Sequence, residues 1–222
     1  MTGILCIDFD DTVVMGNVMR EVLGRFASPG WRDLEASYHR GEMTVEQFNA
    51  RAFELIGSTT AGEIAEFVRT VAVPRPGFAE LYDWAHWHGW QVAIVSNGLD
   101  LYIDPVLQDL GLERVVRHAG RARYIYKWQV RYLSPRGIEI EDGFKVSYVS
   151  AFRAAGDFVV YAGDGASDVE AANLSDVAFA RSTLWEQLGD SHRSIFPFET
   201  FDDVRVVLER EAEGWLARAA LA

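Results

Sequence analysis

Short apolar runs alternate along this chain with longer amphipathic segments, and three of the runs end abruptly in polar or glycine-rich residues. Continuous apolar runs of this length are typical of strands that a parallel sheet buries on both faces. The expected strands are residues 3–7, 92–95, 158–162 and 177–180. Helical periodicity accompanies them at residues 78–87, 101–110, 146–155 and 168–174. This alternation predicts an α/β fold with a doubly wound parallel sheet.

The interval 14–73 breaks the alternation, because its pattern is helical throughout. Helices are expected at residues 18–26, 31–40, 45–56 and 61–71, with no strand between them. Thr44 and Gln47 have the spacing of a capping box at the start of the third helix. Four consecutive helices cannot all be crossover connections between two strands. We therefore expect residues 14–73 to form an inserted helical cap on a core of residues 1–13 and 74–222, rather than to flank the main sheet.

Residues 119–143 are the least regular part of the chain. They carry aromatic and β-branched residues, among them Tyr124, Trp128 and Tyr132, with little helical spacing. Such a pattern indicates either a hairpin or an irregular loop, and the sequence leaves both open.

The composition narrows the classes of function. Of 222 residues, 49% are hydrophobic and 24% charged, as in an ordinary globular protein. Lys and Arg number 21 against 33 Asp and Glu, a net charge of −12, so we expect neither a nucleic acid nor an anionic membrane as partner. No apolar run approaches the roughly 18 residues of a membrane span, and the first residues lack the basic lead of a signal peptide. The single cysteine, Cys6, excludes an internal disulfide framework and a thiolate zinc site. These features favour a cytoplasmic metabolic protein and leave its oligomeric state open.

Carboxylates gather at the ends of the expected strands. Asp8 and Asp10 come directly after the first strand, and Asp164 and Asp168 follow the third. Ligands of an open parallel sheet bind beyond the carboxyl ends of its strands, so these four side chains are expected to converge. Converging carboxylates repel one another, and Mg²⁺, a divalent cation that prefers oxygen ligands, would relieve that repulsion. Without a metal the cluster would need another nearby cation, for which Lys145 is the evident candidate.

Three short motifs add chemistry to this edge of the sheet. Ser96-Asn97-Gly98 follows the second strand and offers a hydroxyl and backbone N–H groups to phosphate oxygens, although alone such a tripeptide is more often a turn. Gly163-Asp164-Gly165 permits close backbone approach but lacks the Gly-Lys-Ser/Thr ending of a nucleotide-binding P-loop. Asp8 and Asp10, past the strand end, could take two roles, with one carboxylate attacking phosphorus and the other transferring a proton, although alone such a pair commonly lies on a solvated surface.

Taken in order, residues 8–12, 96–98, Lys145 and 163–168 resemble the four motifs of the haloacid dehalogenase superfamily of phosphatases. The resemblance covers nearly the whole chain, and the helical insertion after the first motif is similar to that superfamily's C1 cap, as in phosphoserine phosphatase. It implies a Rossmann-like core, Mg²⁺ as cofactor and a small phosphorylated metabolite as substrate. The reaction it implies is hydrolysis of a phosphomonoester through an aspartyl-phosphate.

The resemblance also implies roles for the acidic residues. Asp8 would be the nucleophile and a Mg²⁺ ligand. Asp10 would be the acid and base, with its backbone carbonyl on the metal. Asp164 would bind Mg²⁺ directly, and Asp168 would support the coordination sphere.

The other motif residues are expected around the substrate. Lys145 would be catalytic, since it would neutralise charge on the nucleophile and the phosphoryl group, and Thr12 would orient Asp10. Of the four cap aromatics, one or two are expected to line the substrate pocket and the others to form the cap's core. These four residues are Trp31, Tyr38, Phe48 and Phe53. The expected substrate-binding residues are Thr12, Ser96, Asn97, Gly98 and Arg51.

Within the superfamily, residues 164–181 are most similar to the phosphatases of methionine salvage that act on 2-hydroxy-3-keto-5-methylthiopentenyl-1-phosphate. Cap residues 29–31 and 51–53 share this similarity. The chain departs from that group in three places. Asp11 stands where glycine is usual, Asn17 stands where Asp is usual, and residues 121–143 lack a cysteine-containing segment that some members carry.

Other functions stay open as alternatives. In phosphoserine phosphatase a cap Glu meets the substrate ammonium and a cap Arg its carboxylate, but the aligned positions here are Asn17 and Ala52, with Arg51 beside the latter. A neutral amide does not replace a carboxylate facing an ammonium, so this alternative is less favoured. The further alternatives are a phosphometabolite-binding module without catalysis and phosphotransfer to an acceptor other than water.

Overall fold

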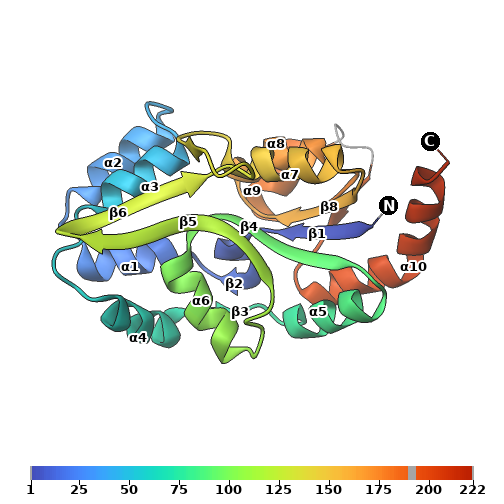
Figure 1. Cartoon of the computed structure of the whole chain (residues 1–222), viewed down its shortest axis with the longest axis horizontal. Helices are drawn as coiled ribbons and strands as arrows, with labels where there is room; N and C mark the ends of the chain where they lie inside the picture. The colour runs from blue at the N-terminus through green and yellow to red at the C-terminus, as the bar shows by residue number, and fades with distance from the viewer. Residues whose placement is uncertain (1, 190–193, 222) are drawn as a thin grey trace.

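The computed structural model describes residues 2–189 and 194–221, and one mixed sheet forms its centre (Figure 1). Its strands are β1 (Gly3–Ile7), β4 (Gln91–Leu99), β5 (Val116–Ile125), β6 (Lys127–Leu133), β7 (Glu139–Ile140), β8 (Phe158–Gly163), β9 (Val177–Ala180) and β10 (Ile195–Pro197). The strand order is β10-β9-β8-β1-β4-β5-β6-β7. Pairing is parallel from β10 to β5 and antiparallel from β5 to β7. The expected α/β core with a doubly wound parallel sheet is confirmed.

Strand β1 lies between β8 and β4 in the sheet, and both of its faces are covered. Ile4 and Cys6 pack under one layer of helices, and Leu5 and Ile7 pack under the other. Burial on both faces explains why the parallel strands are continuous apolar runs in the sequence. The first layer contains α7 (Phe144–Ala154), α8 (Val169–Leu174) and α9 (Ser182–Leu188). The second contains α5 (Phe78–Trp87), α6 (Asp100–Asp109) and α10 (Phe201–Ala219).

The segment predicted to be a cap, residues 14–73, carries four helices between two short strands. These are α1 (Val18–Phe26), α2 (Trp31–His39), α3 (Val45–Phe53) and α4 (Ala61–Val71), between β2 (Val14–Met15) and β3 (Val73–Pro74). The capping box of Thr44 and Gln47 is formed at the start of α3. Strands β2 and β3 pair with each other, so the prediction of no strand in this interval is wrong at its two ends. A ribbon of two residues a side is too short to show a period in the sequence.

The segment that the sequence left undecided contains the hairpin of β5 and β6. Tyr126 makes its turn with φ of 63°, and Ile125 pairs with Lys127 on either side. Trp128 on β6 packs edge-on against Phe53 of α3, with ring centroids 5.6 Å apart. The hairpin therefore widens the sheet and also supports the cap, as its position beside α3 indicates (Figure 1).

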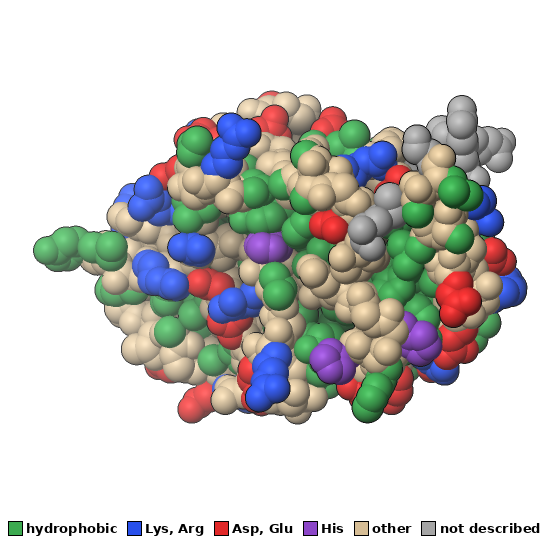
Figure 2. Space-filling view, turned by 45° about the vertical axis from the view of Figure 1, so that its right-hand side comes forward, with side chains coloured by type: hydrophobic (Ala, Val, Ile, Leu, Met, Phe, Trp, Pro, Cys, Tyr) green, Lys and Arg blue, Asp and Glu red, His purple; other side chains and the backbone are tan. Residues whose placement is uncertain are grey.

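The surface gives two further findings. Among the described residues there is no helix of the length and apolar character needed to cross a bilayer. Figure 2 shows one face of the molecule, on which Lys and Arg side chains are interspersed with Asp and Glu. On that face the basic side chains do not gather into the continuous groove that a nucleic-acid backbone would require.

Candidate active site

The expected site residues lie where three parallel strands end. Asp8 directly follows β1, and Asp164 directly follows β8. Strand β4 runs on to Leu99, with a shift in its pairing to β5 beyond Val95. Ser96-Asn97-Gly98 therefore lies within the end of a strand, and the turn that this motif alone favoured is not formed. A cavity of about 190 Å³ lies at this edge, lined by residues of the sheet edge and of the cap.

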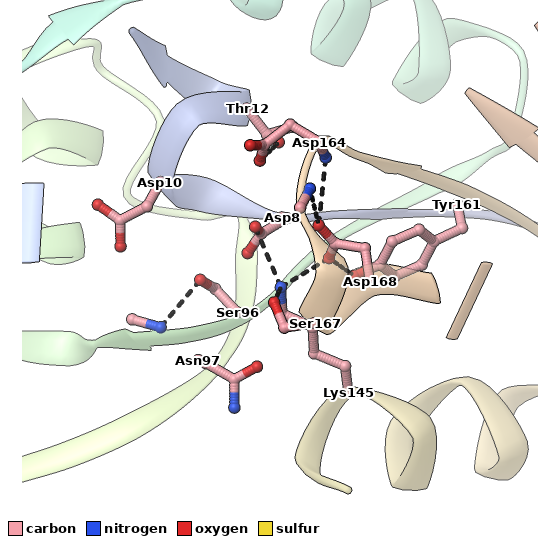
Figure 3. A network of polar contacts seen from close by, with 12 residues as sticks. Asp8, Asp10, Thr12, Ser96, Asn97, Lys145, Tyr161, Asp164, Ser167 and Asp168 are labelled. Carbon is pink, nitrogen blue, oxygen red and sulfur yellow. Dashed lines mark hydrogen bonds and ion pairs between the residues drawn. The ribbon is translucent and has the colours of Figure 1, made fainter. Parts of the chain in front are cut away.

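A buried ion-pair network forms the floor of the cavity (Figure 3). The Lys145 ammonium lies 3.0 Å from Asp8 Oδ2 and 2.6 Å from Asp168 Oδ1. Asp168 is fully buried and also accepts hydrogen bonds from the Tyr161 hydroxyl and from two backbone N–H groups of the loop after β8. Both oxygens of Asp168 are therefore engaged, and this carboxylate orients Lys145 and the loop.

The floor holds more negative charge than its cation balances. Burial raises the pKa of Asp8 to about 7, although the Lys145 ammonium opposes the rise. Burial, with the nearby Asp168 and Asp8 carboxylates, raises the pKa of Asp164 to about 8. Burial alone would lower the pKa of Lys145, but the Asp168 and Asp8 carboxylates outweigh it, and the pKa of this lysine is raised. Lys145 is thus a permanent cation among carboxylates that cannot all ionise easily.

The donor set of this cluster fits a divalent cation. Asp8, Asp164 and Asp168 each offer an oxygen, and these atoms lie within 4.8 Å of one another. Asp8 Oδ1 is buried and has no hydrogen-bond partner among the described residues. An unpaired carboxylate oxygen in a buried acidic cluster is unfavourable without a cation, and Mg²⁺ takes oxygen ligands. Asp8 and Asp164 could bind it, with Asp168 behind them.

The Asp10 carboxylate is separate from that cluster. Its Oδ2 accepts a hydrogen bond of 2.6 Å from the Tyr102 hydroxyl, and its Oδ1 accepts one of 2.7 Å from the Val18 backbone N–H. Burial raises the pKa of Asp10 to about 6, against the effect of these two hydrogen bonds. A carboxyl group with such a pKa can both give and take a proton near neutral pH. Sequence reasoning missed Tyr102, because it reaches Asp10 across 92 positions of the chain.

The structure corrects the expected role of Thr12. Its hydroxyl donates to Asp164 Oδ1 at 3.0 Å, and among the described residues no hydrogen bond joins it to Asp10. The reason is local, since Asp11 adopts a left-handed φ of 57° and turns the chain between Asp10 and Thr12. Glycine adopts this conformation most easily, and position 11 is where the methionine-salvage phosphatases that the chain resembles usually have glycine.

Two arginines that the sequence analysis did not identify hold the loop after β1. Arg75 is only 5% exposed, and its guanidinium donates to the carbonyls of Asp11 and Thr12, each at 2.7 Å. Arg181 donates to the same Asp11 carbonyl at 2.8 Å. Contacts from guanidinium groups to backbone carbonyls leave no residue pattern in a sequence. They fix the loop that carries both Asp8 and Asp10.

The end of β4 supplies the polar groups opposite the acidic cluster. The Gly98 N–H donates to Ser96 Oγ at 3.0 Å, and both residues line the cavity. A Cβ at position 98 would come within 2.7 Å of Tyr102 Oη and 3.2 Å of Asp10 Oδ2, so only glycine fits. The Asn97 side chain donates to Glu46 of the cap at 2.9 Å.

The cap lines the other side of the cavity with apolar residues. Met19, Tyr38 and Phe48 contribute to this wall, and the rings of Tyr38 and Phe48 stack with centroids 5.7 Å apart. Trp31 and Phe53 pack in the hydrophobic core instead. Two of the four cap aromatics therefore reach the cavity.

The cap also brings charged groups to the cavity, though not the arginine that was expected there. Arg20 and Glu35 form an ion pair at 2.6 Å, and Arg20 Nη2 lies 3.3 Å from His39 Nε2. Arg51 is exposed and lines a separate hollow beside Arg131 of the hairpin. Residues 45, 48 and 49 face the cavity from α3, and position 51 lies about 240° further round the helix than position 45.

Comparisons with known proteins identify the family of this chain. A family model of haloacid dehalogenase-like hydrolases matches residues 5–173. The chain is 31% identical over 226 aligned residues to the bifunctional enzyme MtnB/MtnX of Bacillus licheniformis, covering 95% of this chain and 50% of that enzyme. It is 27% identical to the 2-hydroxy-3-keto-5-methylthiopentenyl-1-phosphate phosphatase of Bacillus velezensis, covering 98% of this chain and 95% of that protein. The chain thus spans half the length of the bifunctional relative and nearly all of the other.

A solved structure has a similar fold. The phospho-aspartyl intermediate analogue of a phosphoserine phosphatase superposes with a TM-score of 0.67 at 18% identity, covering 94% of this chain and 98% of that one. The family model matches well over half of the chain, so the resemblance stated from the motifs is confirmed. This chain belongs to the haloacid dehalogenase-like hydrolase family.

Proposed function

We propose that this protein is a Mg²⁺-dependent phosphomonoesterase that hydrolyses a small phosphorylated metabolite through an aspartyl-phosphate on Asp8. One observation carries the proposal. Asp8 has one oxygen held by Lys145 and one buried oxygen without a partner among the described residues, at the wall of a cavity that also contains Asp10. A nucleophile beside a separate acid and base is what two-step phosphoryl transfer requires.

In the proposed first step an Asp8 oxygen attacks phosphorus. The new Asp8–phosphorus bond forms as the ester phosphorus–oxygen bond breaks, and the Asp10 carboxyl gives its proton to the departing oxygen. In the second step water attacks phosphorus, Asp10 takes a proton from that water, and the Asp8–phosphorus bond breaks to release phosphate. The pKa of Asp10, near 6, suits both proton transfers at neutral pH.

The remaining floor residues hold the transferring group. Three donors are available to phosphoryl oxygens: the Lys145 ammonium, the Ser96 hydroxyl and the Gly98 N–H. All three residues line the cavity, and Lys145 also contacts the proposed nucleophile, Asp8. Bound Mg²⁺ would neutralise charge on those oxygens. Asp8 and Asp164 would be the side-chain ligands of Mg²⁺. Thr12 and Asp168 would hold Asp164 in place through their hydrogen bonds to it.

We propose 2-hydroxy-3-keto-5-methylthiopentenyl-1-phosphate as the leading candidate substrate. The support is the substrate for which the Bacillus velezensis relative is named, together with the chemistry of the cap wall. Met19, Tyr38 and Phe48 suit an apolar thioether chain, and the Arg20 guanidinium beside them can donate to a carbonyl or hydroxyl oxygen.

Phosphoserine is the second candidate, on the basis of one observation. Arg20 and Glu35 place opposite charges together at the cavity, which is the pair needed for an amino acid's carboxylate and ammonium. The two groups neutralise each other at 2.6 Å, so phosphoserine would have to separate them. This cost ranks phosphoserine below the ketose-type phosphate.

A phosphate-release assay on a panel of phosphate esters tests the proposal. The panel contains an aryl phosphate, phosphoserine and the ketose-type thioether phosphate, each with Mg²⁺ and with EDTA. We expect Mg²⁺-dependent release, fastest from the thioether compound. Tight binding of one ester without release from any would instead establish a binding module, and a rate that rises with an added alcohol acceptor would establish phosphotransfer.

A further inference from the structure

A buried carboxylate on the cap contacts two parts of the proposed catalytic machinery. Glu46 on α3 is 3% exposed, and no ion pair found among the described residues includes it. Its Oε1 accepts hydrogen bonds from Asn97 Nδ2 at 2.9 Å and from the Phe144 N–H at 3.0 Å. Asn97 is the centre of the segment at the end of β4, and Phe144 immediately precedes Lys145 at the start of α7. One oxygen of the cap therefore joins the two segments that carry the phosphate-binding groups.

A second group of donors converges on the backbone of the same segment. The Asn97 carbonyl accepts hydrogen bonds from Asn49 Nδ2 at 2.8 Å and from the Tyr132 hydroxyl. Asn49 belongs to α3 of the cap and Tyr132 to β6 of the hairpin, and Asn49 Nδ2 also lies 2.8 Å from the Tyr132 oxygen. Both side chains are buried. The cap and the hairpin thus both hydrogen-bond to the same peptide group at the end of β4, the one between Asn97 and Gly98.

The direction of that peptide group has a consequence for phosphate binding. In a trans peptide the C=O and the following N–H point in opposite directions. Because Asn49 and Tyr132 hold the Asn97 carbonyl on the side of the cap and hairpin, the Gly98 N–H must point the other way. It donates to the hydroxyl of Ser96, a residue that lines the cavity. The cap and hairpin therefore determine where this amide points.

We propose that Glu46, Asn49 and Tyr132 are positioning residues that aim the Gly98 N–H and the start of α7 at the phosphoryl group. A buried carboxylate without a cation is unfavourable unless its hydrogen bonds are good ones, and those of Glu46 are made to two segments of the site. The inference rests on the proposed function, since the group to be held is the substrate phosphate. It makes the phosphate site depend on the seating of the cap, in addition to the cap's role in enclosing the substrate.

Variants of Glu46 test this in the whole chain, with three measurements on each. These are kcat and KM for an aryl phosphate, Kd for inorganic phosphate by calorimetry in Mg²⁺, and the thermal midpoint. We expect Glu46→Leu to weaken phosphate binding and to lower kcat, each by about 10-fold or more, because it removes a charged acceptor from two donors. Glu46→Gln keeps an acceptor oxygen and should recover most of both.

The matched control is Glu54→Gln. Glu54 lies at the end of the same helix and forms an exposed ion pair with Lys127 of the hairpin at 2.7 Å, so it joins the same two elements away from the site. This control should leave Kd and kcat within about 2-fold of wild type. If Glu46→Leu and Glu46→Gln lower the thermal midpoint but bind phosphate as the control does, Glu46 is merely structural and the inference is wrong.

A double variant tests the carbonyl contacts independently. Asn49→Leu or Tyr132→Phe alone leaves the Asn97 carbonyl one donor, and each should change phosphate Kd by less than about 3-fold. The pair together leaves a buried carbonyl unpaired and should cost much more than the product of the single effects. Strictly multiplicative effects would contradict the positioning role.

The same measurements distinguish failure of the proposed function from failure of the positioning inference. A wild-type protein that binds phosphate but hydrolyses no ester overturns the proposed function, while the phosphate Kd values still decide the inference. A wild-type protein that hydrolyses the aryl phosphate, with all variants like the control, overturns the inference alone. A wild-type protein that neither binds phosphate nor hydrolyses an ester overturns both.

Discussion

The two walls of the cavity differ in how firmly the fold holds them. On the sheet side, the side chains of Lys145 and Asp8 are 3% and 8% exposed and belong to a continuous buried network. On the cap side, the side chains of Arg20 and Glu35 are 52% and 19% exposed and contact mainly each other. A transferred phosphoryl group needs fixed charges, because reorganisation during the reaction is costly. Selection among leaving groups needs only a surface of suitable shape and polarity, so the cap wall can be looser.

From this contrast we propose that the sheet edge performs the chemistry and that the cap determines selectivity. Substitutions on the sheet side should reduce the rate for every ester. Substitutions on the cap side should change which ester is preferred.

The largest effect is expected from Asp8→Asn. An amide is a poor nucleophile at phosphorus, so turnover of the aryl phosphate should fall by at least about 10³-fold. The same variant removes a carboxylate that is hard to ionise in the metal-free cluster, so its thermal midpoint in EDTA at pH 8 should be above that of wild type. Parallel activity and melting measurements check both, with exposed Asp33→Asn as the control. A variant that is inactive only because it is unfolded would contradict the second expectation.

The second largest effect is expected from Arg75→Met, which should destabilise the protein by about 3 kcal/mol. The side chain is buried, and its loss leaves the carbonyls of Asp11 and Thr12 without one of their donors. Loosening of the loop that carries Asp8 should also slow hydrolysis of all esters. Denaturant unfolding measures the change, and Arg210→Met at an exposed site on α10 is the control. Equal unfolding midpoints for the two variants would show that the loop does not need this clamp.

A smaller effect is expected from pH on the metal-free protein. The folded-state pKa values of Asp8 and Asp164, about 7 and about 8, lie above the ordinary value of 3.8. Between about pH 4 and pH 8 the folded state therefore binds more protons than the unfolded state, and these groups make stability fall as pH rises. Thermal midpoints in EDTA should show this decline, and a double Asp8→Asn, Asp164→Asn variant should show less of it.

Mg²⁺ should oppose this decline, because it binds the ionised carboxylates. Its stabilising effect should therefore be larger at pH 8 than at pH 6. An increase in midpoint that is independent of pH, or no increase at all, would argue against a metal site among these carboxylates.

The smallest effect is expected from Glu35→Gln on the cap. It releases Arg20 from its ion pair, so KM values for esters with charged or polar leaving groups should change by a few-fold. The kcat for the aryl phosphate should stay within about 2-fold, and Glu21→Gln on α1 controls for the loss of charge. A large fall in kcat for all esters would break the division between the two walls.

The sequence predicted the sheet side better than the cap side for a physical reason. Asp8 and Asp164 each stand next to the end of a buried strand, and parallel strands place their carboxyl ends at one edge whatever the rest of the chain does. Lys145 came from its place in the resemblance. Tyr102 and Arg75 were missed, because their contacts to the loop after β1 join distant positions and, for Arg75, involve only backbone acceptors.

On the cap, periodicity located the helices but did not show which way they face. Helix α3 was expected from its pattern and its capping box, yet the face toward the cavity carries Phe48 and Asn49, and Arg51 points elsewhere. Glu46 gave no signal, because a glutamate in the first turn of a helix is usually a solvated residue. The hairpin that supports this face was the segment with the weakest pattern in the whole chain.

The central claim, that Asp8 accepts the phosphoryl group, is tested most directly by trapping the covalent enzyme. An Asp10→Asn variant should still transfer the phosphoryl group from an aryl phosphate to Asp8, because the aryl leaving group needs little protonation. The phosphorylated variant should then stall, because no base activates the attacking water. Acid quenching, proteolysis and mass spectrometry should find one added phosphoryl group on the peptide that contains Asp8. Release of the aryl alcohol with no phosphoryl group there, or with one on another residue, would contradict the account.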